Sequence, residues 1–227
     1  RLCVMKIDVL TLFPEMFEAL NAGVIGRALE KKIFCVTTTN IRDFSQDKHK
    51  KCDDYSYGGG AGMIMTPQPL HSAITETDKN HECLRIYMSP KGKVLSQSLV
   101  EELSKKDKIM LVCGSYEGID QRIIDLDIDA EVSIGDYVLT SGELPAMVLI
   151  NAIARYIDGV LGCEESTNEE SFVVGMLEYP QYTRPKEFLG LSVPDVLLSG
   201  NHQDVSKWRQ EQQLKITKKM RPELIKE

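Results

Sequence analysis

Apolar residues in this chain gather in short continuous runs that alternate with runs at helical spacing. Continuous apolar runs of this length are typical of buried strands. Such a run predicts a strand at 7–13, and further strand candidates are 34–39, 84–88, 108–113 and 130–133. A helix is predicted after Pro14, where the residues at roughly helical spacing are Phe17, Leu20, Val24 and Leu29. Strands that alternate with helices predict an α/β fold with a mostly parallel sheet.

Several predicted strands end in loops that contain turn-forming or permissive residues. These loops are 89–92, 114–118 and 135–137. Because ligands of open α/β sheets bind at the carboxyl ends of the strands, we expect a binding site there. Further along, Leu144-Pro145 predicts the start of a helix that continues to Ile157. Proline suits the first helical position because the amide that it lacks would be unpaired anyway.

The predicted elements divide the chain into a first domain at 1–161, a linker or lid at 162–175 and a mostly helical second domain at 176–227. The segment 162–175 is polar and acidic with little periodicity, which is typical of a linker or a mobile lid. In the second domain we expect a long helix from about Gln203 to Lys219. The residues that share one face of this helix are Val205, Trp208, Gln212 and Ile216.

The composition is that of a folded protein without membrane spans. Hydrophobic residues make up 42% of the chain, yet no apolar stretch approaches the ~20 residues that cross a bilayer, so we expect a soluble, cytoplasmic protein. The six cysteines are scattered, which favours reduced thiols. Neither cysteine nor histidine shows metal-site spacing, so no metal ligands are predicted. The net charge of −7 argues against wholesale nucleic-acid coating but leaves room for local basic faces.

Some local features have both a functional and a structural interpretation. The glycine-rich segment 58–62 lets backbone approach a ligand closely, but an ordinary turn explains it equally well. It matches neither the P-loop nor the dinucleotide-binding fingerprint. The basic residues at 48–51 and on the C-terminal helix suit phosphate contacts, although a solvated face is the commoner explanation. Trp208 is favoured as a core anchor over a base-stacking platform.

Sequence blocks with a specific order extend over nearly the whole chain from Met5. In the first part they are LFPEMF at 12–17, DKHK at 47–50, YGGG at 57–60, CGSYEGID at 113–120 and SIGDYVL at 133–139. In the second part they are GELPA at 142–146, YTRP at 182–185, VPDVLLSG at 193–200 and KWR at 207–209. In this order the blocks closely resemble those of the bacterial tRNA (guanine-N1)-methyltransferases of the TrmD family.

The resemblance implies a SPOUT methyltransferase fold, in which a deep C-terminal trefoil knot forms the S-adenosylmethionine pocket of an obligate homodimer. Periodicity does not reveal such a knot, which is an exception to the usual rule for chain connections. Mapped by motif, the cofactor pocket comprises Tyr87, Met88, Ser89, Gly114, Tyr116, Glu117, Ile134, Gly135, Asp136, Tyr137, Val138, Leu139, Gly142 and Pro145. Mg²⁺ dependence is also implied, although the sequence shows no ligand cluster for it.

The implied substrate is tRNA with guanine at position 37, beside the anticodon. The N1 atom of this guanine must lose a proton before its lone pair attacks the methyl carbon, so a base is needed. The family uses aspartate in an Asp-Ser pair, whereas alignment from Arg155 places Glu170-Ser171 there. We hypothesise that Glu170 is the base, that Arg155 stabilises charge on the guanine O6 and that Ser171 steadies the substrate.

By resemblance, each active site draws its lid from the opposite subunit. Further substrate contacts are expected at His49, Asp54, Gly59, Lys207 and Arg209. The sequence also departs from the family at Ala61, Ser115 and Ser141, where proline, arginine or lysine, and glycine are common. A side chain at Ser141 would narrow the cofactor pocket.

Two rival functions remain open on the sequence. One is a tRNA-binding protein that keeps the scaffold but lost turnover when glutamate replaced the aspartate. The other is a SPOUT enzyme that methylates ribose hydroxyls, which would need neither an N1 base nor guanine at the target. The C-terminal segment that resembles the TrmD family disfavours this second rival.

Overall fold

The computed structural model describes residues 3–161, 170–172 and 175–225. The chain divides into two compact units, Arg1–Gly162 and Cys163–Glu227. Most of the expected linker or lid, namely 162–169 and 173–174, lies outside the described residues.

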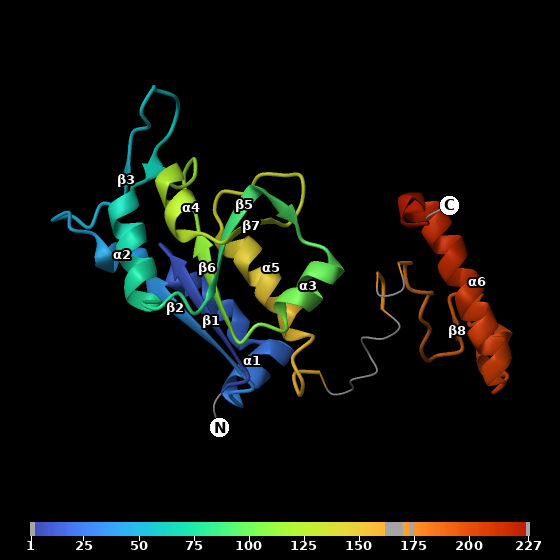
Figure 1. The fold of residues 1–227 in the computed structure, drawn as a ribbon. Helices are drawn as coiled ribbons and strands as arrows, with labels where there is room; N and C mark the ends of the chain where they lie inside the picture. The colour runs from blue at the N-terminus through green and yellow to red at the C-terminus, as the bar shows by residue number, and fades with distance from the viewer. Residues whose placement is uncertain (1–2, 162–169, 173–174, 226–227) are drawn as a thin grey trace. The chain divides into compact units, whose positions relative to one another are not determined.

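The first unit is built on a five-stranded parallel sheet, which confirms the predicted α/β class (Figure 1). Its strands are β1 (Met5–Thr11), β2 (Phe34–Asn40), β5 (Leu84–Val94), β6 (Lys108–Cys113) and β7 (Ala130–Ser133). The strand order is β2-β1-β6-β5-β7. In the centre of the sheet, Ile7 pairs with Val36 on one side and with Ile109 on the other.

Helices cover both faces of this sheet (Figure 1). On one face lie α1 (Gly23–Glu30), α3 (Gln97–Leu103) and α5 (Glu143–Ala154); on the other lie α2 (Pro67–Thr77) and α4 (Gln121–Asp127). Because side chains alternate along a strand, Ile7 and Val9 of β1 enter the core under α5, whereas Leu10 enters the core under α2. The sheet therefore separates two apolar cores.

The segment after Pro14 is not one continuous helix. It forms a 3₁₀ helix, η1 (Pro14–Asn21), and then α1, because Ala22 between them is extended, with ψ 157°. Phe17 and Leu20 are buried as predicted, but Val24 is 39% exposed. The apolar residues therefore keep their helical spacing from η1 into α1, and this spacing gives no sign of the extended backbone at Ala22.

The loop expected at 89–92 is instead part of β5. This strand continues to Val94, with a shift in its pairing to β7 between Met88 and Lys93. Pro90 lies in the shifted stretch, and a bulge accommodates a residue that has no amide hydrogen to donate to a strand ladder. The prediction of a loop was therefore wrong, although the strand does become irregular there.

Several smaller elements complete the first unit. A short antiparallel hairpin joins β3 (Asp53–Asp54) to β4 (Ile64–Met65), and η2 (Ile41–Phe44) precedes it. Sequence patterns did not predict this hairpin, because its strands have two residues each. The helix α5 begins at Glu143 and ends at Ala154, three residues before the predicted end.

One expectation about the cysteines was wrong. Cys3 and Cys35 form a disulfide, with their Cα atoms 6.0 Å apart. The Val4 amide donates a hydrogen bond to the Ile33 carbonyl, which extends the first strand alongside the second and brings the two cysteines together. The free cysteines of the described residues, Cys52, Cys83 and Cys113, are buried.

The second unit contains the long predicted helix. This helix, α6 (His202–Met220), begins after Asn201, whose side chain accepts a hydrogen bond from the Gln203 amide. The remaining elements are β8 (Glu187–Phe188), β9 (Leu191–Ser192), η4 (Asp195–Leu198) and η5 (Pro222–Leu224). The predicted inner face of α6, which includes Val205 and Trp208, is half-buried. Among the described residues, no helix is long and apolar enough to span a bilayer.

Candidate active site

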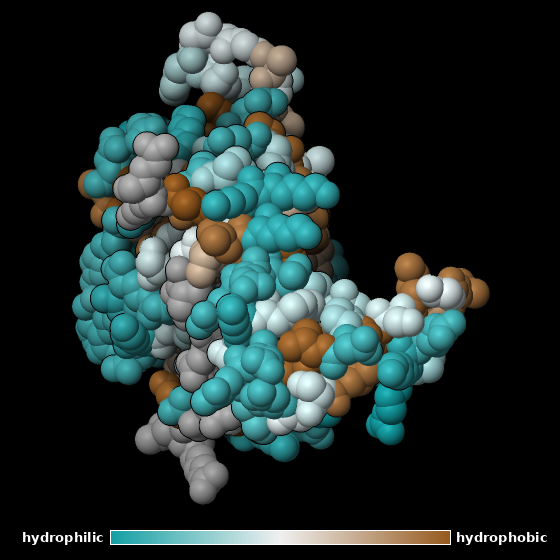
Figure 2. All heavy atoms as spheres, turned by 90° about the vertical axis from the view of Figure 1, so that its right-hand side faces the viewer, coloured by the Kyte–Doolittle hydropathy of each residue, from teal (hydrophilic) through white to brown (hydrophobic). Residues whose placement is uncertain are grey.

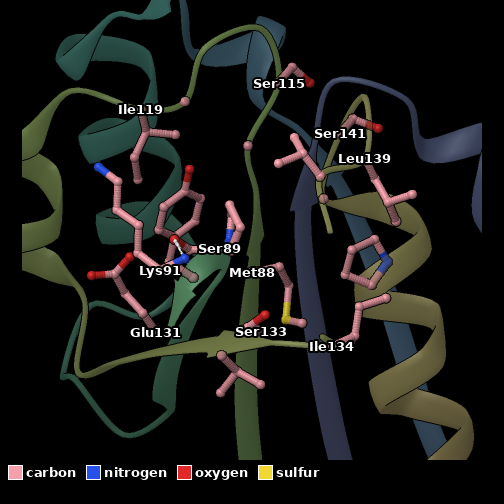
Figure 3. Close-up of a pocket in the computed structure, with 18 of the residues that line it drawn as sticks. Met88, Ser89, Lys91, Ser115, Ile119, Glu131, Ser133, Ile134, Leu139 and Ser141 are labelled. Carbon is pink, nitrogen blue, oxygen red and sulfur yellow. Dashed lines mark hydrogen bonds between the residues drawn. The ribbon is translucent and has the colours of Figure 1, made fainter. Parts of the chain in front are cut away.

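A cavity of about 200 Å³ lies at the carboxyl edge of the sheet, where the sequence predicted a binding site (Figure 3). It is enclosed by the end of β5, the loop after β6 and the loop between β7 and α5. In Figure 3, Met88, Ser133 and Ile134 line one part of the hollow, while Lys91 and Glu131 stand across from Leu139. The site thus uses strand ends that are far apart in the sequence.

The structure brings together almost all of the residues expected in the cofactor pocket. Those that line the cavity are Tyr87, Met88, Ser89, Gly114, Tyr116, Glu117, Ile134, Gly135, Tyr137, Val138, Leu139, Gly142 and Pro145. Asp136 is not part of the lining. The lining also includes Lys91, Glu131 and Ser133, which sequence reasoning missed. Ser133 ends β7, and that position was the signal that would have found it.

Close backbone packing holds together the loop after β6 and the loop between β7 and α5. The Gly142 amide donates to the Gly114 carbonyl at 2.8 Å, and Ser115 pairs with Ser141 in an isolated antiparallel bridge. A Cβ added at Gly142 would lie 2.9 Å from the Cα of Cys113, so only glycine fits between these segments. The bridge also shows that the two serines that depart from the family face each other across the loops.

Buried polar atoms of the lining lack partners within the described chain. The Ser115 Oγ and one Glu131 carboxylate oxygen, Oε2, are buried and accept or donate no hydrogen bond there. Buried polar groups are nearly always paired, so such atoms mark a place for a polar ligand. Burial raises the pKa of the nearby Tyr87 phenol, and the Glu131 carboxylate raises it further, which keeps that hydroxyl neutral.

Beneath the loops lies a fully buried carboxyl group. Glu143, the first residue of α5, accepts a 2.6 Å hydrogen bond from the Thr11 hydroxyl at the end of β1. Its other oxygen, Oε2, has no partner among the described residues. Burial raises the pKa of the neighbouring Cys113 thiol well above its usual range, with a further contribution from Glu143. Cys113 is therefore a neutral packing residue and not a nucleophile.

The three residues expected to perform the chemistry lie in both units. Arg155 is half-buried at the C-terminal end of α5, in the first unit. Glu170 and Ser171 are half-buried in the second unit. The Ser171 hydroxyl accepts a 3.0 Å hydrogen bond from the Glu178 amide, which orders the chain around the Glu-Ser pair.

The expected substrate contacts fall in two places. His49, Asp54 and Gly59 are exposed on or beside the β3–β4 hairpin. In the second unit, Lys207 is exposed on α6, whereas the Arg209 guanidinium lies 4.6 Å from the centre of the Tyr179 ring. That cation–π contact gives Arg209 a packing role within its own unit. Trp208 packs against Tyr182, with ring centres 6.3 Å apart, as expected of an anchor.

No metal centre emerges from the part of the chain that the structure describes. Within 3–161, 170–172 and 175–225, no three His, Cys, Asp or Glu side chains are grouped so that they could hold a metal ion. The lining of the cavity offers backbone groups, hydroxyls and apolar side chains. These groups suit an organic ligand with a polar edge.

Comparison with known proteins identifies the family. Residues 5–227 match the family described as "tRNA (Guanine-1)-methyltransferase TrmD". A tRNA (guanine-N(1)-)-methyltransferase of Clostridioides difficile (strain 630) is 54% identical, with 98% of each chain covered. Proteins of the same description from Clostridium botulinum (strain Hall) and Alkaliphilus metalliredigens are each 53% identical, with 98% of this chain and 92% of the relative covered. This chain therefore belongs to the TrmD family of tRNA (guanine-N1)-methyltransferases.

Proposed function

We propose that this protein transfers a methyl group from S-adenosylmethionine to N1 of guanine 37 in tRNA, as a cytoplasmic homodimer with a knotted SPOUT fold. The observation that carries the proposal is the cavity at the carboxyl edge of the sheet, whose lining includes the residues that motif comparison assigned to the cofactor. Membership of the family supplies the reaction class. The knotted fold is proposed from the family, because a SPOUT fold is what the resemblance to it implies.

The residues present fit S-adenosylmethionine. Backbone groups at 134–139 would hold the adenine, and the unpartnered Ser115 hydroxyl and Glu131 carboxylate oxygen offer polar contacts. Glu117, Glu131 and Lys91 place charges of both signs on the lining, which suits a cofactor that carries a sulfonium, an ammonium and a carboxylate group. When bound, the cofactor supplies an electrophilic methyl carbon. The described residues offer no ligand cluster for Mg²⁺, so the proposal gives that ion no step.

The protein's own groups then move one proton and stabilise one charge. The Glu170 carboxylate would accept the proton from N1 of the guanine and so free the N1 lone pair to take the methyl group, while the electron pair of the broken S–C bond would stay on the sulfur of the cofactor. Negative charge develops on O6 as this proton leaves, and the Arg155 guanidinium stabilises it. Ser171 steadies the substrate while its hydroxyl keeps the Glu178 amide paired.

Two subunits are proposed to share each active site. The helix α5 carries Leu144 and Val148 one turn apart, and these side chains are 49% and 47% exposed. Apolar residues on the same exposed face of a helix are typical of an association surface. The segment 162–175 would act as the linker and lid that brings Glu170 of one subunit to Arg155 of the other, and 176–227 would bind tRNA.

The experiment compares methyl transfer by Glu170→Gln and Arg155→Ala with the unaltered enzyme. Each variant is expected to lose about 100-fold or more in kcat, as expected when a base or a charge-stabilising group is removed. Affinity for S-adenosylmethionine, measured by calorimetry, should stay within about twofold of the unaltered enzyme. Full turnover by either variant would remove its residue from the mechanism. Binding of tRNA and cofactor without turnover in the unaltered protein would favour a non-catalytic tRNA-binding protein.

A further inference from the structure

Two tyrosines stand out from the first unit at the tip of the β3–β4 hairpin. Tyr55 is 79% exposed and Tyr57 is fully exposed, at 102% of its reference area. The projecting tip is at the top of Figure 1 and forms the pale protrusion at the top of Figure 2. Neither ring contributes to the apolar cores of the unit. A large apolar surface that is kept in water in this way indicates a contact with something outside the unit.

The tip is fixed to the rim of the cavity by backbone hydrogen bonds. The Glu117 amide donates to the Met63 carbonyl at 3.0 Å, and the Met65 amide donates to the Gly118 carbonyl at 2.9 Å. Glu117 and Gly118 both line the cavity. The returning strand of the hairpin is therefore an extension of the cavity wall, and the loop that carries the tyrosines projects from the same hairpin.

The turn that contains Tyr57 and directly follows Tyr55 has a defined shape. The Ser56 hydroxyl donates a 2.9 Å hydrogen bond to the Gly59 carbonyl, and the Gly59 amide donates to the Ser56 carbonyl. This reciprocal pair closes a turn between Tyr55 and the glycine-rich stretch. Because the backbone is constrained, the rings are presented to solvent with less loss of entropy on binding than a floppy loop would suffer.

Lysines lie in the loop that precedes the hairpin. Lys48, Lys50 and Lys51 are exposed there, and Asp47 orders the loop by accepting hydrogen bonds from the His49 and Lys51 amides at 2.7 and 3.3 Å. Lys50 pairs with Asp43 and Lys51 with Asp54 at exposed sites, where ion pairs are weak and a phosphate can compete for the lysine. Exposed aromatic rings beside lysines are the combination that proteins use for single-stranded nucleic acid, since the rings stack on bases and the cations face phosphates.

We propose that Tyr55 and Tyr57 stack on unpaired bases of the tRNA loop that carries the target guanine, and so position the guanine at the cavity. The inference rests on the proposed function and adds two substrate-positioning residues to it. Unpaired loop bases are the part of a tRNA that aromatic side chains can stack on. The contact is independent of cofactor binding, because neither tyrosine lines the cavity.

The test measures tRNA methylation by Tyr57→Leu and Tyr55→Leu, with Tyr→Phe at each position as the matched control. Leucine keeps the apolar volume but loses the flat ring, so KM for tRNA should rise about 10-fold in each leucine variant, whereas phenylalanine should restore it. Affinity for S-adenosylmethionine should not change. Leu126→Ala, at a 74% exposed position on α4, controls for the loss of an exposed apolar side chain.

Salt dependence separates stacking from charge. The slope of log Kd for tRNA against log salt should be unchanged in Tyr57→Leu but lower in Lys48→Ala, because only the lysine displaces counterions from phosphates. Leucine variants with an unaltered KM would overturn the stacking role, as would a change in oligomeric state, which would show that the tip contacts a second copy. If the unaltered enzyme methylated no tRNA, the proposed function itself would fail.

Discussion

In the cavity, a Cβ added to Gly142 would lie 2.9 Å from the Cα of Cys113, whereas one added to Gly58 at the hairpin tip would meet nothing within 4 Å. Gly142 has an ordinary φ of −83°, while Gly58 has φ +85°. The first position requires glycine because there is no space, and the second because of its backbone conformation. Gly142 is therefore limited by packing and Gly58 by local geometry, so the same substitution at these two positions should have unequal effects.

The largest effect is expected for Gly142→Ala. The new methyl group would press on the backbone of Cys113 and Gly114, which cannot turn aside as a flexible side chain can. We expect affinity for S-adenosylmethionine to fall by about 100-fold or more, as expected when the loops that form a closely fitted site are displaced. Calorimetric titration with the cofactor measures this change.

Gly58→Ala is the matched substitution in the hairpin. Its methyl group has room, so the cost is the strained backbone alone, about 1 kcal/mol in the free energy of unfolding. Affinity for S-adenosylmethionine should be unaltered. If Gly58→Ala weakened cofactor binding as strongly as Gly142→Ala, steric fit at Gly142 would not explain the effect, and the contrast drawn between the two glycines would be wrong.

An intermediate effect is expected for Thr11→Val, beneath the cavity. Valine has nearly the same shape but removes the hydroxyl that donates to the buried Glu143 carboxyl group. A buried carboxyl group without this partner should lower the free energy of unfolding by about 2 kcal/mol. Urea unfolding of the variant and of Thr11→Ser, which keeps the hydroxyl, gives the comparison. An unaltered midpoint in Thr11→Val would show that Glu143 does not depend on this bond.

The smallest effect concerns the exposed carboxylate beside the hairpin. Hydrogen bonds from the His49 amide and then from the Lys51 amide lower the pKa of Asp47 below its usual range. A lowered folded-state pKa means that this contact stabilises the loop above the usual aspartate pKa and is lost as pH falls through the lowered value. The protection factor of the His49 amide, which is the intrinsic exchange rate at each pH divided by the observed rate, should therefore fall only in acid. Asp47→Asn, which cannot ionise, should abolish that pH dependence; a persistent acid response would contradict the assignment.

The centre of the sheet was predictable because β1 and β6 are buried on both faces and are rich in apolar residues. β6 and β7 begin and end where the sequence patterns placed them. The hairpin was not predictable because its two-residue strands are too short to show a periodic pattern. The break at Ala22 was not predictable because the apolar residues keep their helical spacing while the backbone becomes extended.

The position of the cavity was predictable from the sequence, but the full set of residues that line it was not. Loops rich in glycine at strand ends indicated where a ligand binds, but periodicity does not show which loops meet in space. The hydrogen bond between Gly142 and Gly114 joins residues that are far apart in the sequence, and no local pattern predicts such a pairing. Glu131 was missed because a charged residue within a strand pattern carries no local signal of facing a cavity.

The central claim is guanine-directed methyl transfer. The measurement that tests it most directly is transfer of a labelled methyl group from S-adenosylmethionine to unmodified tRNA with guanine at position 37, beside an otherwise identical transcript with adenine there. The account predicts label in the guanine transcript alone, recovered as 1-methylguanine. Equal labelling of both transcripts, or label on ribose, would contradict it.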